Sequence, residues 1–434
     1  MRCRLVVSSG LGLLLVFAAC LHAAEPAVQV SVVTDRPDAI YSVGQPVRFL
    51  VTVKQEGQAA DGEVVCTIDK DGMPPSTTKT LKLDKGAAAI EGTLNEPGFL
   101  KCSATYTGKD KPMATAMAGA AIDPLKIPPS LSVPDDFDAF WAQQKVRLAA
   151  VPMKPTLTPV ESSGGGIECF DVEISCVPPK PVSGYFARPG NAAPKTLPAI
   201  LSVQGAGVRN SDLHRATRAA KQFNALAMDI NAHGIPNGKP DDFYKALATG
   251  ELKGYQLFGR EDREQCYFLG MFLRMTRALE FLTSQPQWDG KTLIVEGGSQ
   301  GGGQSIAAAG LDPRVTFIAA SVPAICDHSG HVVGRAAGWP GLVPDKDGKP
   351  DPKLLQVARY FDCMNFATRA KADAIFSVGF IDTVCRATSV YAAYNNLPGK
   401  KQIVTEPFGV HATFPRFERA ADAAVAAHIA AMKK

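Results

Sequence analysis

The chain has 434 residues, of which 46% are hydrophobic and 20% are charged, and its formal net charge is +4. This length suggests two or three domains, and the composition is that of a globular protein able to bury a core. No block of lysines and arginines stands out, so the sequence does not indicate a nucleic-acid partner.

The N-terminus has the layout of a secretory signal peptide. Two arginines precede a mostly apolar stretch at 5–19, and small residues before Glu25 offer a cleavage site. We therefore predict a signal peptide over 1–23 and an exported protein, either periplasmic or secreted. Two alternatives stay open: a short buried helix, and a lipid anchor on Cys20, whose preceding residues loosely resemble a lipoprotein cleavage site. The apolar stretch is too short for a good membrane span, and no later segment is long and apolar enough for one.

Residues 24–123 predict an all-β domain. Short alternating segments recur at even spacing between turns rich in Gly, Pro, Asp and Lys, which is typical of a β-sandwich. Cys66 and Cys102 fall in two central strands and could form a disulfide between the sheets, although two isolated buried thiols fit the sequence too. The expected strands are 28–33, 47–53, 63–68, 79–83, 88–94, 99–106 and 114–121.

A proline-rich stretch at 124–134 predicts the linker to a second domain, 135–434. An amphipathic helix opens that domain at Asp135, with acidic residues in its first turn. Apolar strands and helices then alternate, which predicts a mainly parallel α/β sheet. The expected strands are 167–177, 182–187, 197–203, 223–230, 292–296, 315–322, 374–378 and 402–405, with helices from about 213 and over 264–284, 299–310 and 416–432.

Gly297-Gly298-Ser299-Gln300-Gly301 matches the G-x-S-x-G pattern. Its context strengthens the match, because it directly follows an apolar strand and opens a helix, as a nucleophile elbow requires. A serine at such a turn lies at a helix N-terminus, where the backbone N–H of Gln300 can stabilise an oxyanion. The competing interpretations are a phosphate loop and a plain tight turn, but the Walker lysine is missing. Ser299 is therefore the predicted nucleophile.

In this fold the serine is followed along the chain by an acid and then by a histidine. His411 is the candidate base by elimination, since it lies on the loop after the last strand. The other histidines precede the serine or any good acid, or lie in the leader or the last helix. Asp382 follows the strand at 374–378 and is the predicted acid, with Asp373 and Glu406 as rivals.

The expected roles follow the template of a serine hydrolase. His411 removes the Ser299 proton and later returns it to the leaving alkoxide, while Asp382 holds the imidazole tautomer. The second oxyanion donor is expected from the loop after the strand at 197–203, which reads Gln204-Gly205-Ala206-Gly207-Val208. No clustered Cys/His pattern indicates a metal site.

A long ordered set of motifs carries a family resemblance. The motifs are Phe137-Asp138-Ala139-Phe140-Trp141, 297–303, Asp312-Pro313-Arg314, Val322-Pro323 with Cys326-Asp327, Tyr360-Phe361-Asp362 with Asn365-Phe366-Ala367, 376–379, 382–385 and 391–395. With these motifs, residues 133–434 resemble the acetyl xylan esterase/cephalosporin C deacetylase family of carbohydrate esterases, which have the α/β-hydrolase fold. The preceding β-sandwich is similar to the immunoglobulin-like modules of exported glycan-acting enzymes.

The resemblance implies an esterase that removes acetyl groups from small acetylated sugars and related acetates, without a metal or organic cofactor. It carries the catalytic triad onto Ser299, Asp382 and His411, and the oxyanion hole onto the backbone N–H groups of Val208 and Gln300. Family members tend to form hexameric rings, so a homo-oligomer is a further expectation.

The sequence departs from the family pattern at three places. Val208 stands where the family usually has a tyrosine, so the backbone donor survives but a wall of the acetyl pocket is lost. Arg386-Ala387 replaces a Pro-Pro pair, and 410–413 replaces a Gly-His-Glu-Gly pattern. These changes leave the triad in place and weaken the transfer of a particular substrate.

Two classes of function stay open. The first is an exported esterase acting on acetylated xylan-type oligosaccharides, or a close variant with another acyl specificity. The second is a lapsed hydrolase that only binds glycan, and a complete triad in the correct order argues against it. The segment 329–353 is rich in glycine and lacks clear periodicity, so we expect either a lid or rim beside the site or a plain surface insertion.

Overall fold

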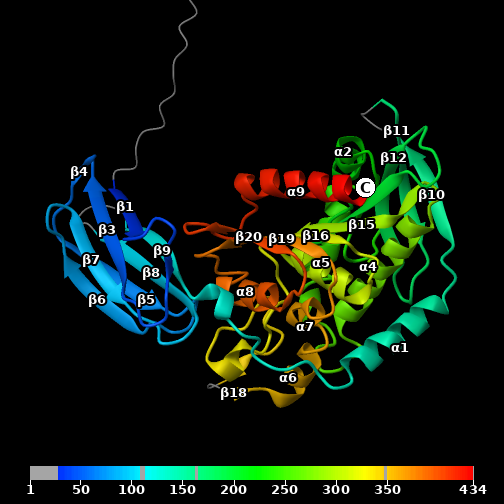
Figure 1. The fold of residues 1–434 in the computed structure, drawn as a ribbon. Coiled ribbons are helices and arrows are strands. Elements are labelled where there is room, and N and C mark those ends of the chain that lie inside the picture. Colours follow the sequence, from blue (N-terminus) through cyan, green and yellow to red (C-terminus); the bar gives the residue numbers. More distant parts are fainter. Residues whose placement is uncertain (1–27, 108–112, 162–164, 347–348, 434) are drawn as a thin grey trace, which may run out of the picture.

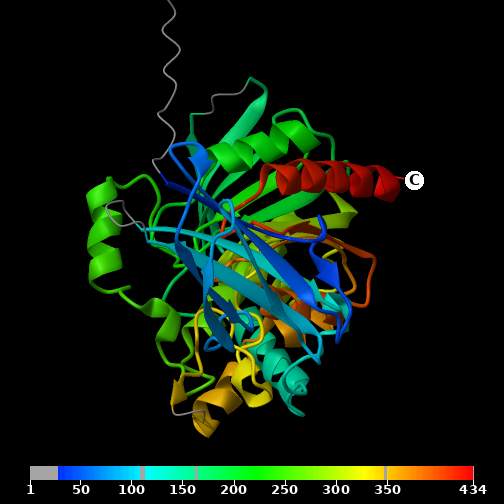
Figure 2. The same cartoon turned by 90° about the vertical axis from the view of Figure 1, so that its left-hand side faces the viewer.

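The computed structural model describes residues 28–107, 113–161, 165–346 and 349–433. The predicted signal peptide and Cys20 lie outside these residues. Figure 1 shows a purely β region, ending at Ile122, beside a larger region in which helices pack on both faces of one sheet. Turned by 90°, the β region stands in front of the larger one (Figure 2).

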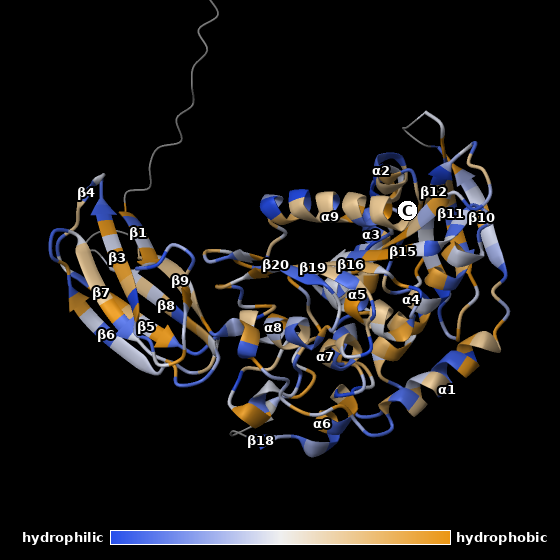
Figure 3. Cartoon of the chain, viewed as in Figure 1, coloured by the Kyte–Doolittle hydropathy of each residue, from blue (hydrophilic) through white to orange (hydrophobic). Residues whose placement is uncertain are grey.

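Within the described residues, the β region consists of two sheets around a core of its own. One sheet has the order β1-β3-β4, with β7 also pairing with β3, and the other has the order β2-β9-β8-β5-β6. Alternate residues of β3 are buried, so one face of the strand points inward, and Figure 3 shows the alternation of hydropathy along it. The predicted β-sandwich is therefore confirmed. Its strands are β1 (Val28–Thr34), β2 (Ile40–Tyr41), β3 (Val47–Gln55), β4 (Gln58–Ala59), β5 (Glu63–Asp69), β6 (Thr77–Lys82), β7 (Ala87–Gly92), β8 (Gly98–Tyr106) and β9 (Ala114–Ile122).

The suggested disulfide between the two sheets is wrong. Cys66 lies on β5 and Cys102 on β8, and these strands are neighbours in the same sheet. In their register Cys66 faces Ala104 and Cys102 faces Ile68. Both thiols are free and fully buried. The sequence shows that both strands are central, but it does not show which sheet each strand joins.

The larger region is built on a sheet that has nine strands in the described part of the chain, in the order β10-β11-β12-β14-β13-β15-β16-β19-β20. Neighbours from β14 to β20 run parallel, whereas the pairings that involve β10, β11 and β12 are antiparallel. The predicted mainly parallel sheet is confirmed. The strands are β10 (Pro155–Val160), β11 (Ile167–Ile174), β12 (Val182–Pro189), β13 (Leu197–Val203), β14 (Leu226–Ile230), β15 (Trp288–Gly298), β16 (Phe317–Ser321), β19 (Asp373–Gly379) and β20 (Lys401–Glu406), and β17 (Asp345–Lys346) and β18 (Lys349–Pro350) form a separate hairpin.

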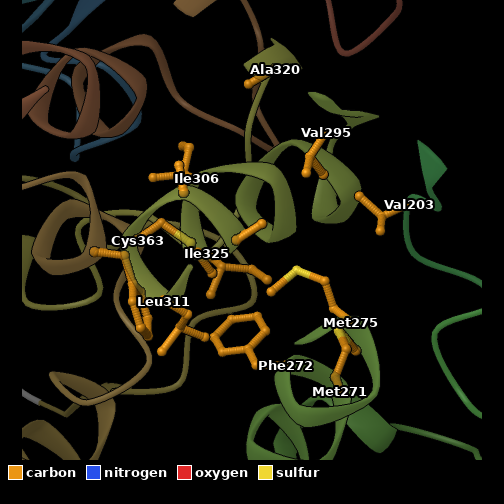
Figure 4. Packing of buried hydrophobic residues seen from close by; sticks show 14 of the residues in the cluster. Val203, Met271, Phe272, Met275, Val295, Ile306, Leu311, Ala320, Ile325 and Cys363 are labelled. Carbon is orange, nitrogen blue, oxygen red and sulfur yellow. The ribbon is translucent and has the colours of Figure 1, made fainter. Parts of the chain in front are cut away.

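Helices cover both faces of this sheet. Buried residues of α2 and α9 cluster with one face, and those of α4, α5, α7 and α8 cluster with the other. Figure 4 shows the second contact, where Val203, Val295 and Ala320 of the strands meet Ile306 of α5 and Met275 of α4. The helices are α1 (Phe137–Ala149), α2 (Leu213–Phe223), α3 (Asp241–Thr249), α4 (Tyr267–Ser284), α5 (Gln300–Leu311), α6 (Pro352–Ala358), α7 (Cys363–Ala367), α8 (Ala387–Asn396) and α9 (Pro415–Lys433), with short 3₁₀ turns η1 (Pro124–Lys126), η2 (Tyr255–Leu257) and η3 (Gly330–Val333). Among the described residues, none of these helices combines the length and apolarity needed to cross a bilayer.

Two differences from the sequence-based expectation have a clear physical reason. The strand expected at 223–230 begins only at Leu226, because α2 continues to Phe223 and Asn224 ends that helix in the left-handed conformation. The edge strand β10 was not predicted. It contains two prolines, which are tolerated at a sheet edge but argue against a strand when the sequence is considered alone.

The proline-rich stretch after the sandwich is tied to the α/β region by hydrogen bonds. Three polar side chains from distant parts of the chain donate to its backbone carbonyl groups. Asn395 Nδ2 donates to Pro124 and Ile127 at 3.0 and 2.9 Å, Arg335 Nη1 to Pro128 at 3.0 Å, and Arg359 Nε to Ser132 at 3.2 Å. The segment predicted as a linker is therefore held along much of its length.

Candidate active site

Ser299 lies on a sharp turn between β15 and α5. Its backbone has φ 55° and ψ −122°, a strained conformation for a residue other than glycine. Such a tight turn is possible because Gly297 and Gly301 carry no side chains. A Cβ on Gly297 would lie 2.5 Å from the Gly301 carbonyl oxygen, and a Cβ on Gly301 would lie 2.3 Å from the Val203 carbonyl oxygen. The Ser299 N–H donates to the Ser321 carbonyl at 2.9 Å, which ties the turn to β16.

The three side chains predicted as a triad come together in the structure. His411 Nε2 lies 3.0 Å from Ser299 Oγ, and His411 Nδ1 lies 2.8 Å from Asp382 Oδ2. The carboxylate is fully buried, whereas the imidazole is 27% exposed. A Nδ1–H that donates to the carboxylate leaves Nε2 as an acceptor for the serine hydroxyl, and this tautomer is assigned from these contacts.

Asp382 lies on the loop just after β19, where its second oxygen is also satisfied. Oδ1 accepts two backbone N–H groups of the following turn, from Val384 at 2.8 Å and Cys385 at 2.9 Å. Of the two rival acids, Asp373 lies at the opposite end of β19, and Glu406 ends β20. Within the described residues, Asp382 is the only one of these three acids that pairs with the imidazole of His411.

A cavity of about 940 Å³ opens around Ser299 and His411. Its walls are about equally polar and apolar, with charged side chains from the start of α2 and from α9. Trp339, which belongs to the segment 329–353, also lines the cavity, so this part of the segment forms its rim. The lining charged and histidine side chains are Arg209, Asp212, His214, Arg215, Arg218, Glu296, His411, Glu418 and Asp422, and the larger apolar ones are Val322, Trp339, Val384 and Phe417.

Residues 126–428 match the acetyl xylan esterase (AXE1) family. The chain belongs to this family. The acetyl esterase Axe7A of Xylanibacter ruminicola is 31% identical over 387 residues, which cover 88% of this chain and 86% of that protein. This acetyl xylan esterase family member is therefore a carboxylic ester hydrolase, as predicted.

Two solved structures resemble this family member in fold. The acetyl xylan esterase from Paenibacillus sp. R4 superposes with a TM-score of 0.59 at 26% identity, covering 70% of this chain and 98% of that one. Acetyl xylan esterase 1 from Thermoanaerobacterium sp. JW/SL YS485 gives a TM-score of 0.58 at 22% identity, covering 70% of this chain and 97% of that one. The predicted α/β-hydrolase fold is confirmed.

Buried side chains that the sequence analysis missed hold the loop after β13. The Nε2 of His233 contacts the Gly207 carbonyl oxygen at 2.8 Å, and its Nδ1 contacts the Tyr267 hydroxyl at 2.6 Å. The Tyr255 hydroxyl donates to Gln300 Oε1 at 2.7 Å and accepts the Gly207 N–H at 3.4 Å. His233 was set aside because it precedes the serine, and no local pattern marks either tyrosine.

Burial also controls the protonation of His233. Because the ring is removed from water, its pKa falls from 6.5 to about 4, and the nearby Arg274 and Arg209 lower it further, while the contact with the Gly207 carbonyl opposes the shift. The imidazole is therefore neutral at neutral pH. A neutral ring with Nε2–H donates to Gly207 and accepts from the Tyr267 hydroxyl at Nδ1.

A partly buried ion cluster lies under the same loop. Arg215 pairs with Glu296 at 3.2 Å and approaches Asp229 at 3.9 Å. Asp229 Oδ1 accepts from Gln204 Nε2 at 2.8 Å and from the Asp212 N–H at 2.7 Å. Burial raises the pKa of Asp229 to about 6, while Arg215 and these hydrogen bonds oppose the shift. Among the described residues, no three His, Cys, Asp or Glu side chains are grouped so as to hold a metal ion.

Proposed function

We propose that this protein removes acetyl groups from acetylated xylan-type oligosaccharides, or similar small acetate esters, through an acyl-enzyme on Ser299. The observation that carries the proposal is the continuous relay from Asp382 Oδ2 through His411 to Ser299 Oγ, with contacts of 2.8 and 3.0 Å. The similarity to an acetyl esterase and to acetyl xylan esterases supports acetyl as the acyl group.

In the proposed reaction, Ser299 Oγ attacks the acetyl carbonyl carbon while His411 Nε2 takes the hydroxyl proton. The electron pair of the C=O bond moves onto its oxygen. When this pair returns, the bond to the sugar oxygen breaks, and that oxygen takes the proton from His411. Water then repeats the attack on the acetyl-serine, which releases acetate and restores the hydroxyl. Asp382 stabilises the imidazolium in both halves.

The oxyanion in this proposal is held by the backbone N–H groups of Gln300 and Val208. Gln300 is the first residue of α5, so its N–H has no partner within the helix. In the described part of the chain, the Val208 N–H also lacks an acceptor. His233 holds the Gly207 carbonyl on one side. The Val208 N–H belongs to the same trans peptide group as the Gly207 carbonyl and points in the opposite direction, away from His233.

The cavity supports a polar substrate larger than acetate. Three arginines and four carboxylates of the lining nearly balance in charge, and both kinds of group can hydrogen-bond hydroxyls. A half-buried tryptophan, Trp339, adds a flat apolar surface of the kind on which a sugar ring can lie. These features fit a neutral polyhydroxylated chain rather than a strongly charged ligand.

The decisive experiment compares p-nitrophenyl acetate hydrolysis by the wild type and by Ser299→Ala. We expect kcat to fall on the order of 10³-fold or more, because the nucleophile is lost. Ser31→Ala, at an exposed position of β1, serves as the matched control and should keep the wild-type rate. Equal rates for the wild type and Ser299→Ala would refute the triad.

A substrate screen then tests the acyl group and the carrier. Acetylated xylo-oligosaccharides should be hydrolysed with a higher kcat/KM than p-nitrophenyl esters of longer acids. If butyrate or longer esters are preferred, the protein is an esterase of another acyl specificity that uses the same triad.

We further propose that the chain is exported, that 1–23 is removed, and that 24–123 and 135–434 are two domains joined by 124–134. The basic, apolar and small-residue pattern of the leader supports export. The mass of the protein recovered after expression with its leader would test this directly. A mature chain that starts at a lipid-modified Cys20 would instead show anchoring.

A further inference from the structure

The β-sandwich packs directly on the loop that carries Asp382. The buried ring of Phe99, on β8, lies edge-to-face with Phe380 at 5.1 Å and 5.6 Å from Tyr391 of α8. Gly119, on β9, comes so close that a Cβ there would lie 2.6 Å from the Phe380 carbonyl oxygen. Phe99 belongs to the same buried cluster as the core of the α/β region. The two regions therefore share a core at this point.

A second contact fixes the other end of the loop. Helix α8 has Arg386 at its N-cap position, and this residue makes no side-chain cap. Asp71 of the sandwich supplies one, since its Oδ2 accepts the N–H of Thr388, in the first turn, at 2.8 Å. The Arg386 side chain lies against Gly72, where a Cβ would be 2.2 Å from its Nε. Burial raises the pKa of the Asp71 carboxyl, and Lys101, the Thr388 hydrogen bond and Arg386 oppose that shift, in decreasing order.

These contacts bracket Asp382, because Phe380 precedes it by two residues and Thr388 follows it by six. Between them lies Arg386-Ala387, a pair without proline. A pair of prolines stiffens a loop from within, because each ring fixes its own φ angle. Arginine and alanine do not fix the loop in this way. The N–H groups of Phe380 and Ile381 donate to Glu406 and Gly409, which ties the start of the loop to its own sheet, and the sandwich contacts add a second restraint.

We propose that the β-sandwich is a positioning element for the reaction: through Asp71, Phe99 and Gly119 it holds the loop that aims Asp382 at His411. This inference rests on the proposed function, since the orientation of the Asp382 carboxylate matters only if the triad is catalytic. None of the three sandwich residues is within the triad contacts, so Asp71 is a positioning residue.

The test uses the full chain and four variants: Asp71→Ala, Asp71→Asn, Gly119→Ala and, as a matched control, Asp84→Ala at an exposed turn of the sandwich. We expect Asp71→Ala and Gly119→Ala to lower kcat about tenfold on p-nitrophenyl acetate with KM within about twofold, because a small misplacement weakens the chemical step rather than binding. Asp71→Asn keeps an oxygen for the Thr388 N–H and should recover most of the rate. The control should match the wild type.

Active-site titration with a fluorophosphonate separates positioning from folding. Positioning predicts a full count of reactive serines, each labelled about tenfold more slowly. If the variants show fewer reactive serines with an unchanged rate per site, or if Asp71→Ala keeps its kcat, the inference fails. Retained activity in Ser299→Ala would instead overturn the proposed function, so the two failures are distinguishable. If Asp71→Ala does not fold, Gly119→Ala gives the same readout from the other contact.

Discussion

Ser299 and Asp382, the proposed nucleophile and acid, are held in place in different ways. Ser299 lies in a strained turn that is supported within its own sheet, by close packing of Gly301 on β13 and a hydrogen bond to Ser321 of β16. Asp382 lies in a loop whose two ends contact a separate β-sandwich, through Phe380 and Thr388. The first arrangement has glycines within a few residues of the serine, whereas the second also includes contacts with residues far away in the sequence.

The comparison indicates which parts of the site tolerate substitution. The elbow tolerates little change, because its strain of about 1–3 kcal/mol is balanced by close packing and hydrogen bonds within a few residues of the serine. The loop that carries Asp382 is contacted both by its own sheet and by the β-sandwich. Variants on the two sides should therefore behave differently.

The largest effect should come from Asp382→Asn. The amide keeps the shape of the side chain but no longer fixes the imidazole with Nε2 free to accept, so kcat should fall on the order of 10⁴-fold. Steady-state hydrolysis of p-nitrophenyl acetate checks this. Asp373→Asn, at the far end of β19, is the control and should keep its rate. A large loss in the control with none in Asp382→Asn would mean that the acid is misassigned.

The elbow should be the next most sensitive. In Gly301→Ala the new methyl would lie 2.3 Å from the Val203 carbonyl oxygen, so α5 and β13 must separate and the serine must move. We expect a loss of about 10²- to 10³-fold in kcat. The neighbours of Gly165 leave open space, so Gly165→Ala should have no effect. Wild-type activity in Gly301→Ala would remove the contrast with the acid loop.

The smallest effect concerns the third support, His233 beneath the oxyanion loop. Its pKa is about 4 in the folded protein and about 6.5 when unfolded, so the folded state disfavours the charged ring. The contribution of the neutral ring to the unfolding free energy is fully present above pH 6.5 and is lost as the pH falls towards 4. His233→Gln has no such proton to gain. From pH 7.5 to pH 4, the wild type should therefore lose about 3 kcal/mol of unfolding free energy relative to this variant.

Urea unfolding of both proteins across that range measures the difference. Parallel stability curves for the wild type and His233→Gln would show that the ring is not buried in the way the structure describes. A gap that widens towards acid in favour of the variant would identify an acid-sensitive support that the elbow does not share.

The sequence predicted those features that local patterns determine. The G-x-S-x-G turn, the order of serine, acid and histidine, and the alternation of strands and helices were enough to bring Ser299, Asp382 and His411 to one edge of the sheet. Long-range contacts were not predictable. The pairing of Asp71 with Thr388 joins residues 317 positions apart, and the sheet membership of Cys66 and Cys102 depends on topology rather than on strand pattern.

The shared core between the sandwich and α8 has a practical consequence for anyone who trims this chain. A fragment beginning at residue 126, where the family match starts, would lose the ring of Phe99 and leave Phe380 and Tyr391 facing water. Such an apolar patch promotes aggregation, so the shortened enzyme should be poorly soluble even though it contains every triad residue. Fusion proteins and crystallisation trials should therefore keep the N-terminal sheets attached to the hydrolase part.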